Sequence, residues 1–302
     1  MKHNLNFVNY FRKFNILSLI LVLISLIFIT FKGLNYGIDF KGGTLIEIRL
    51  ENKDTKVSNI RDSLRKINLG DVNVKNFGED SDFLIKIEEK LNNNEALITK
   101  IKTTLNQDLN EEVNYRRVES VGPKVSAELL KSGVISIGLA LLMMLFYIWF
   151  RFEWQFSLGS IIALFHDVII TVGIFSLLSI EINLSIVAAV LTIVGYSMND
   201  TVVIYDRIRE NLSKYNKLDV DQISNLSVNE TLSRTLITSV TTLLALFSIF
   251  ILGGEILKGF SFAMILGVVI GTYSSIFVAS PVLKYLNVTY KTLEKKEEKI
   301  VP

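Results

Sequence analysis

The sequence contains no cysteine, only three prolines and only two histidines, His3 and His166. The absence of cysteine excludes disulfides, thiolate metal ligands and a cysteine nucleophile. Two histidines are too few for a histidine-built metal centre. The net charge of +2 is too small to indicate nucleic-acid binding. No Gly-rich loop ending in Lys-Ser or Lys-Thr occurs, so ATP hydrolysis is not predicted. We therefore expect no cofactor and no metal.

Apolar residues, in contrast, make up 50% of the chain. They are concentrated in six segments that are long enough to be membrane-spanning helices. The segments are 14–31, 134–150, 156–178, 182–205, 235–252 and 260–283. Arg12 and Lys13 precede the first segment, as in a secretory signal, but no small-x-small cleavage site follows it. We interpret this segment as an uncleaved anchor.

Lys and Arg residues in the short loops predict how the chain is oriented in the membrane. Basic residues precede the first segment, lie in the loops after the second and fourth, and follow the sixth, whereas residues 179–181 contain none. Because basic loops stay on the cytoplasmic side, both termini are expected there. The prediction is a cytoplasmic N-terminus (1–13), a cytoplasmic loop (206–234), a cytoplasmic tail (284–302) and a periplasmic region (32–133).

The periplasmic region has the patterns of a soluble domain. Four stretches indicate strands, at 44–50, 72–77, 83–87 and 113–118, and two have helical spacing, at 57–67 and 97–109. The order βαββαβ is typical of a ferredoxin-like sandwich. The predicted fold class is therefore a polytopic α-helical membrane protein with six transmembrane helices and one α+β ferredoxin-like external domain.

An acidic residue, Asp200, lies near the end of the fourth apolar segment, between Asn199 and Thr201. A carboxylate inside a membrane is unfavourable by about 3 kcal/mol or more unless it is protonated, paired or hydrated. We interpret Asp200 as an ion or proton site, or as the counter-ion of a cationic partner. The alternative is a polar contact that only joins helices.

Three other ionisable residues lie in or at the edge of the apolar segments. His166 and Asp167 fall near the middle of the third segment. They are either relay partners of Asp200 or a hydrogen-bonded pair that locks two helices. Arg234 opens the fifth segment and either reaches into the bundle or points to water.

A group of charged residues follows Asp200. Asp206, Arg207, Arg209 and Glu210 lie at the expected cytoplasmic interface. Arg207 is two turns from Asp200, nearly on the same helix face, but a long basic side chain near a membrane interface can simply extend to water. We interpret this group as an orientation and packing device.

Four stretches of sequence, 37–44, 121–129, 163–167 and 195–211, together with 234–239, carry specific motifs. Their motif residues are Asp39, Gly42, Gly43, Gly122, Pro123, Gly195, Asp206 and Arg207. These stretches resemble the SecF family of Sec protein-translocase subunits, a branch of the resistance-nodulation-division superfamily. Met198 stands where that family more often has isoleucine. The resemblance spans nearly the whole chain, apart from the interior of the external domain and the tail.

The resemblance implies a role in the bacterial inner membrane. The family pairs with SecD as a heterodimer, and the pair uses the proton or sodium motive force to promote late steps of protein export through SecYEG. YajC, YidC and the unfolded preprotein are further partners that the family implies. Asp200 matches the family's intramembrane acid and Arg234 a basic residue of the same pathway. We assign Asn199, Asp167 and His166 to that coupling site, and no catalytic residue is expected.

Two alternatives remain from the sequence. The first is a half-unit of a small-molecule exporter of the same superfamily, although such exporters usually have twelve helices and two large external loops. The second is an intramembrane aspartyl protease that uses Asp206 with Asp167 or Asp200. That fold needs a Gly-x-Gly-Asp acid, which the sequence does not contain.

Overall fold

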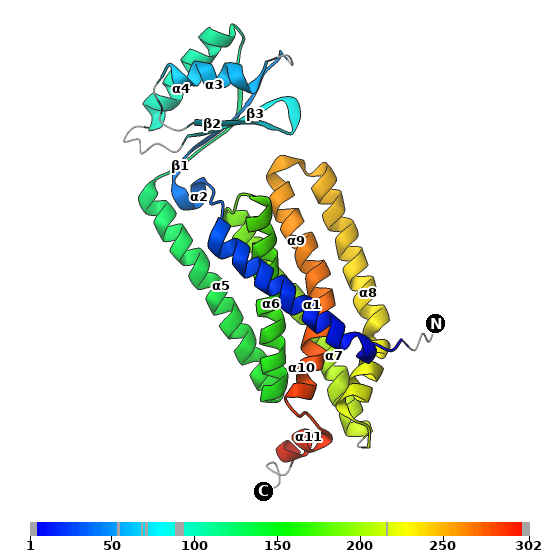
Figure 1. The fold of residues 1–302 in the computed structure, drawn as a ribbon. Helices are drawn as coiled ribbons and strands as arrows, with labels where there is room; N and C mark the ends of the chain where they lie inside the picture. The colour runs from blue at the N-terminus through cyan, green and yellow to red at the C-terminus, as the bar shows by residue number, and fades with distance from the viewer. Residues whose placement is uncertain are drawn as a thin grey trace. The chain divides into compact units, whose positions relative to one another are not determined.

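The computed structural model describes residues 5–52, 55–67, 69, 72–87, 94–215 and 217–297. The chain forms two compact units, one of residues 1–35, 135–180 and 185–302, the other of residues 36–134 and 181–184. Six helices within the described residues are long and apolar enough to cross a membrane. The second unit contains a small four-stranded sheet (Figure 1). This architecture confirms the predicted fold class.

The membrane unit contains the spanning helices, which differ in how far they are buried. They are α1 (Val8–Ile27) with the π-helical turn η1 (Phe28–Lys32), α5 (Pro123–Arg151), α6 (Trp154–Leu178), α7 (Leu184–Lys214), α8 (Val220–Leu252), and α9 (Gly254–Ser274) continued by η2 (Ser275–Ala279) and α10 (Ser280–Tyr285). In the apolar 18-residue stretch of each span, about half of the residues are buried in α6, α7 and α9–α10, whereas less than a fifth are buried in α1, α5 and α8. The inner three helices therefore contain most of the side chains that lipid cannot reach.

Most helices are longer than the apolar segments of the sequence. The first begins at Val8 and the second at Pro123, and residues 206–234 are not a loop because α7 continues to Lys214 and α8 begins at Val220. These polar extensions stay helical because they pair with each other. Arg207 donates to Glu230 over 2.6 Å, and Asn211 donates to Ser227 over 3.0 Å.

The predicted tail also contains structure. Helix α10 ends at Tyr285, and a further short helix, α11 (Tyr290–Glu297), follows. Residues 298–302 of the tail and 1–4 of the N-terminal segment lie outside the described residues. Where hydropathy falls, the sequence therefore marks the edge of the apolar surface and not the end of a helix.

The external unit has the predicted βαββαβ order. Its elements are α2 (Ile38–Lys41), β1 (Gly43–Arg49), α3 (Val57–Arg65), β2 (Val72–Phe77), β3 (Glu79–Ile87), α4 (Asn94–Leu109) and β4 (Asn114–Val121). The strand order is β2-β3-β1-β4, and all neighbours are antiparallel, as in a ferredoxin-like sandwich. Ile46, Ile48 and Leu50 of the β1 segment pack with the helices in one core.

The turn between β2 and β3 is tight. The strand predicted at 83–87 starts earlier in the structure, because β3 begins at Glu79, directly after Gly78, which has a φ of 88°. Asp82 therefore lies within the strand and is buried. Arg49 of β1 donates two hydrogen bonds to its carboxylate, of 2.5 and 2.6 Å. These bonds and the nearby Arg116 hold the pKa of Asp82 below its usual range.

Candidate functional site: a buried polar cluster between α6, α7 and α9

Close packing of α9 against α7 creates the site. A side chain at Gly267 would overlap Ile193 of α7, and one at Gly271 would lie 2.9 Å from the Ser197 side chain. Small residues allow helix backbones to approach in this way, after which hydroxyl groups can bond across the interface. The approach brings the hydroxyl groups of Thr272 and Ser274 next to acids on the neighbouring helices.

Asp167 of α6 is completely buried, with 0% of its surface exposed. Its Oδ2 atom accepts hydrogen bonds from Ser197 of α7 (2.5 Å) and Ser274 of α9 (2.8 Å). Its Oδ1 atom lies 2.8 Å from Nδ1 of the adjacent His166. Asp167 thus joins three helices through a well-satisfied carboxylate.

His166 continues this network towards α1. Its ring stacks on Tyr273 with 6.0 Å between centroids. The Tyr273 hydroxyl donates to the Phe14 carbonyl over 2.7 Å and lies 2.7 Å from the Ser18 hydroxyl. The Nε2 atom of His166 is buried and has no hydrogen-bond partner among the described residues. Buried polar atoms are normally hydrogen-bonded, so this nitrogen is an exception within the bundle.

Asp200 of α7 is also buried, with 2% of its surface exposed, but it is held less firmly. Its Oδ2 atom accepts one long hydrogen bond, of 3.5 Å, from Thr272 of α9. The Thr272 hydroxyl also lies 2.7 Å from the Ser239 hydroxyl of α8. Ser239, Asn199 and Arg234 complete the polar groups that interact with this carboxylate.

The two carboxylates therefore belong to separate networks. The structure brings His166 and Asp167 together in a hydrogen-bonded pair that contacts α7 and α9. Within the described residues, no direct hydrogen bond links Asp167 to Asp200. Ser197 lies one turn before Asp200 on α7, and Ser274 lies two residues after Thr272 on α9. The networks are thus adjacent on the same helices.

The charged group after Asp200 forms ion pairs of its own. Arg207 contacts Glu230 (2.6 Å) and Glu210 (2.5 Å), so it is not the partner of Asp200. Asp206 pairs with Arg151 at the end of α5, over 3.2 Å. This group ties α7 to α5 and α8 at one end of the membrane unit.

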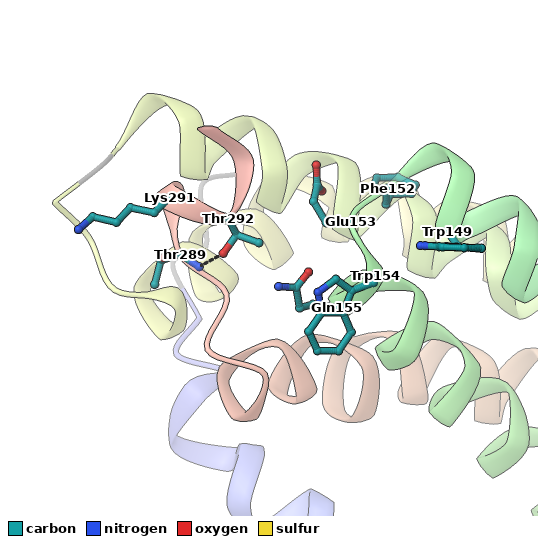
Figure 2. Close-up of a pocket in the computed structure, with 8 residues that line it drawn as sticks. All are labelled: Trp149, Phe152, Glu153, Trp154, Gln155, Thr289, Lys291 and Thr292. Atoms are coloured by element: carbon teal, nitrogen blue, oxygen red, sulfur yellow. Dashed lines mark hydrogen bonds between the residues drawn. The ribbon is translucent and has the colours of Figure 1, made fainter. Parts of the chain in front are cut away.

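Sequence reasoning missed a buried acid at the turn between α5 and α6. Glu153 is 7% exposed and lies 3.4 Å from Arg209 of α7. It borders a cavity of about 550 Å³ that both tryptophans of the chain, Trp149 and Trp154, also line (Figure 2). The amine of Lys291, another lining residue, points away from Glu153. An acid between two apolar segments was the signal that could have identified it.

The remaining hydroxyl partners were also not assigned to the site. In the sequence, Ser197, Thr272 and Ser274 resemble any other small residues in an apolar helix. Their role depends on which helix faces which, and one sequence does not contain that information. Within the described residues, no three His, Asp or Glu side chains gather where they could hold a metal ion.

The other motif residues lie away from this cluster. Asp39 lies in the short helix α2, and Gly42 and Gly43 follow it. Gly122 lies between β4 and α5, and Pro123 is the first residue of α5. Gly42 has a φ of 82°, and a side chain there would lie 3.3 Å from the Val121 carbonyl oxygen. These residues shape the point where the external unit begins and ends.

Gly195 and Asn199 lie on the outer surface of α7. Both are exposed in the isolated chain, and a side chain at Gly195 would have no atom within 4 Å. The same helix therefore has a buried acidic face and an exposed face with small and polar residues. Exposed polar atoms at the level of Asn199 indicate contact with something other than lipid.

These features define a polytopic membrane subunit with one external ferredoxin-like unit and a buried acid cluster. Two family models match the chain: "Protein export membrane protein SecD/SecF, C-terminal" over residues 101–289, and "SecD/SecF GG Motif" over residues 27–54. Protein translocase subunit SecF of Rickettsia rickettsii is 45% identical over 93% of this chain and 92% of its own length. SecF of Desulfurispirillum indicum is 42% identical, over 94% of both chains.

A solved structure shows the same fold. SecDF of Thermus thermophilus, described as a translocon-associated membrane protein, is 36% identical with a TM-score of 0.84. The match covers 93% of this chain but only 38% of the SecDF chain. The chain belongs to the SecF family of protein translocase subunits. It is therefore a multi-pass membrane protein of the protein-export machinery, and neither the exporter nor the protease alternative is supported by these relatives.

Proposed function

We propose that this chain, with a SecD-like partner, couples a proton or sodium gradient to late steps of protein export. The observation that carries the proposal is the environment of Asp200, which is buried on α7 with one long hydrogen bond. A protonated carboxyl group is neutral and tolerates this site, whereas an ionised one needs water, a metal ion or a cation. Each change of state therefore alters how α7 packs against α8 and α9.

Arg234 is the cation that we assign to the ionised state. It lies on α8, is exposed in the isolated chain and makes no ion pair with any residue that the structure describes. It interacts with Asp200 through space. An arginine near the hydrocarbon region is unfavourable without a partner. We infer that Arg234 moves between Asp200 and a group on the partner chain during the cycle.

The partner is proposed from what this chain leaves uncovered. The relatives of known structure are SecDF chains, and this chain accounts for 38% of the length of one of them. Gly195 and Asn199 on α7 and Arg234 on α8 are all exposed in the isolated chain and are suited to contact with helices of SecD. SecYEG, YajC and YidC are the proposed neighbours of the pair, and an unfolded preprotein is the proposed client.

The orientation of the chain follows from its basic loops and is also a proposal. We place both termini in the cytoplasm and the external unit in the periplasm of a bacterial inner membrane. The chain has no cysteine, so single-cysteine labelling needs no background removal. Lys75→Cys on β2 should react with an impermeant maleimide in intact cells with a permeable outer envelope. Lys214→Cys should react only after lysis, and labelling of Lys214→Cys from outside would overturn the orientation.

The coupling itself is tested with Asp200→Asn, which keeps the size of the side chain but cannot ionise. We expect the variant to fold and bind SecD, yet to lose the gradient-driven part of preprotein export in membrane vesicles while ATP-driven export remains. Asp167→Asn is the matched control, and we expect a milder loss. Arg234→Met should resemble Asp200→Asn, and the double variant should be no worse than either single one, because the two groups act as one switch.

Full gradient-dependent export by Asp200→Asn, at normal protein levels, would contradict the proposal. Asp200 would then be a contact that only joins helices, and an amide would replace it at a cost of about 1 kcal/mol.

A further inference from the structure

The turn between α5 and α6 borders a cavity that shares no described lining residue with the coupling site. The volume of this cavity is about 550 Å³, which is within the usual range for small-molecule sites. The turn supplies one wall, and the segment after α10 supplies another through Thr289, Lys291 and Thr292 (Figure 2). This segment is held in place, because Val288 is buried and Leu293 packs against the apolar core of the membrane unit. The cavity is therefore part of the folded membrane unit.

Two residues of the turn bring unpaired hydrogen-bond acceptors to the cavity. Glu153 is the N-cap residue of α6, but its side chain makes no capping hydrogen bond. Arg209 forms an ion pair with Glu153 Oε1 over 3.4 Å, yet neither carboxylate oxygen accepts a hydrogen bond from any described residue. The side-chain oxygen of Gln155 is also buried and has no donor among the described residues. Buried oxygens normally have donors, so these three are suited to accept hydrogen bonds from a ligand.

An ammonium group matches this set of acceptors. It donates up to three hydrogen bonds, and it carries the charge opposite to that of a carboxylate. The Glu153 side chain is only 6% exposed, so water and salt screen its attraction to a cation less than they would at the surface. The chemistry of the cavity therefore favours a ligand with a primary ammonium group.

Aromatic side chains indicate that the cavity lies where the membrane meets water. Trp149 and Trp154, which both line it, are 57% and 56% exposed. Phe146 and Phe150 of α5 are exposed as well. Tryptophan is enriched at membrane–water interfaces, and an indole ring attracts an ammonium group through its face. These side chains therefore suit a ligand that has both apolar chains and a cationic head.

Lys291 adds a positive charge to the cavity without neutralising the acid. Its amine points away from Glu153 (Figure 2). A zwitterionic phospholipid carries an ammonium group and a phosphate group close together, so it requires an acidic and a basic partner close to each other. Glu153 and Lys291 supply these two partners from different walls of one cavity.

We propose that this cavity binds the headgroup of an ethanolamine phospholipid, with its ammonium group on Glu153 and Gln155 and its phosphate group near Lys291. The acyl chains then lie along the exposed aromatic side chains of α5. The bound lipid fills the space between the α5–α6 turn and the C-terminal segment, and it supplies the donors that the buried oxygens lack. The inference is independent of ion coupling at Asp200.

The first test compares headgroups on the native chain. Trp149 and Trp154 are the two tryptophans of the sequence and both line the cavity, so tryptophan fluorescence reports on this site. The full-length protein in mild detergent is titrated with phosphatidylethanolamine or with phosphatidylcholine of the same acyl chains. Choline has no N–H group, so phosphatidylethanolamine should change the emission at an about tenfold lower concentration, equivalent to one hydrogen bond to a charged group. Equal concentrations for the two lipids would overturn the proposal.

The second test removes the charge of the acid. Glu153→Gln keeps the size of the side chain and should reduce the preference for phosphatidylethanolamine from about tenfold to less than about twofold. Glu210→Gln on α7 is the matched control, because the Glu210 side chain is 61% exposed and does not line the cavity, so the preference should stay the same. A preference that survives in Glu153→Gln would overturn the assignment of Glu153. The headgroup comparison uses the native chain and decides the proposal even if this variant fails to fold.

The third test distinguishes a lipid from other sources of a primary ammonium group. Phosphoethanolamine carries the headgroup without acyl chains, and Nα-acetyl-lysine amide represents a lysine of a partner protein. Both should bind at least about 100-fold more weakly than phosphatidylethanolamine in competition titrations, because they lack the apolar contacts with α5. Binding of either compound as tightly as the lipid would overturn the lipid assignment, and the cavity would then be a site for a soluble amine or for a basic residue of a protein.

Discussion

Asp167 and Asp200 are both buried acids on neighbouring helices, but their surroundings differ. Asp167 has three close partners, Ser197, Ser274 and His166, at 2.5 to 2.8 Å. Among the described residues, Asp200 accepts a long hydrogen bond of 3.5 Å from Thr272 and also interacts with Ser239, Asn199 and the exposed Arg234. A carboxylate with several donors is stabilised in one state, whereas one with few donors can change state at little cost. The first is suited to hold helices together and the second to switch.

The most damaging change in this comparison should be Asp167→Ala. It removes the acceptor of three hydrogen bonds in the core, each worth about 0.6 kcal/mol on average and up to about 1.7 kcal/mol. We expect the free energy of unfolding to fall by about 2 to 3 kcal/mol, visible as a lower melting temperature in detergent. Asp200→Ala is the control, with an expected loss of about 1 kcal/mol or less. Equal losses would remove the distinction between the two acids.

Gly267→Ala should come next, because it acts on the packing that both networks share. A methyl group there would overlap Ile193, whose branched side chain has little freedom to move. Overpacking of this kind typically costs 1–3 kcal/mol, so we expect a loss of about 2 kcal/mol. Gly195→Ala, on the exposed face of the same helix pair, should change stability by less than about 0.5 kcal/mol. A stable Gly267→Ala variant would mean that α7 and α9 can separate without loss.

The sequence indicated which acidic residues lie inside the membrane segments, but not which partners surround them. Asp200, Asp167 and His166 could be identified because charged residues are rare in apolar segments and therefore conspicuous. Whether these residues contact one another depends on which face each of the three helices turns towards its neighbours, and the sequence does not give that orientation. Ser197 shows the difficulty, because a serine that bonds Asp167 cannot be distinguished by sequence from one that bonds its own helix.

The fold was more predictable than the site because it depends on periodic patterns. Alternation along 44–50 and helical spacing along 97–109 repeat over several residues, so single exceptions matter little. Residues 206–234 were predicted as a loop but are mostly helical, because the Arg207–Glu230 and Asn211–Ser227 contacts stabilise helix ends that hydropathy does not detect.

Another buried carboxylate, Asp82, sharpens the comparison because it lies in the external unit and pairs with Arg49. Hydrogen bonds from Arg49 lower its pKa, so its contribution to stability is fully present above the unfolded pKa of about 3.9. That contribution is lost as pH falls below this value through the folded pKa, since protonation breaks the pair. We expect about 1 kcal/mol from this pair.

The measurement is hydrogen exchange of β1 and β3 peptides in the full-length protein between pH 6 and pH 3, after correction for intrinsic rates. Protection should fall at the acidic end in the native chain. Asp82→Asn should lower protection at pH 6 and flatten the dependence. An unchanged slope in Asp82→Asn would assign the acid sensitivity to another group.

The smallest expected effect distinguishes the two networks by single hydroxyl groups two residues apart on α9. Ser274→Ala removes a 2.8 Å hydrogen bond to Asp167, whereas Thr272→Val removes a 3.5 Å bond to Asp200 and a contact with Ser239. Bonds to a charged acceptor are stronger when they are short, so Ser274→Ala should lower the free energy of unfolding by about 1.5 kcal/mol. Thr272→Val keeps the shape of the side chain and should lower it by about 0.5 kcal/mol.

Function should follow the opposite order. Thr272→Val removes one hydroxyl donor from the Asp200 carboxylate, so the ionised state should be less accessible and gradient-driven export should need a lower proton concentration on the releasing side. Ser274→Ala should leave that dependence unchanged, because Asp167 keeps two of its three donors. Export assays in vesicles with imposed gradients, run beside thermal melts of the same two variants, measure both quantities. If one variant were worse in both assays, the acids would not have separate roles, because stability and coupling would then depend on the same network.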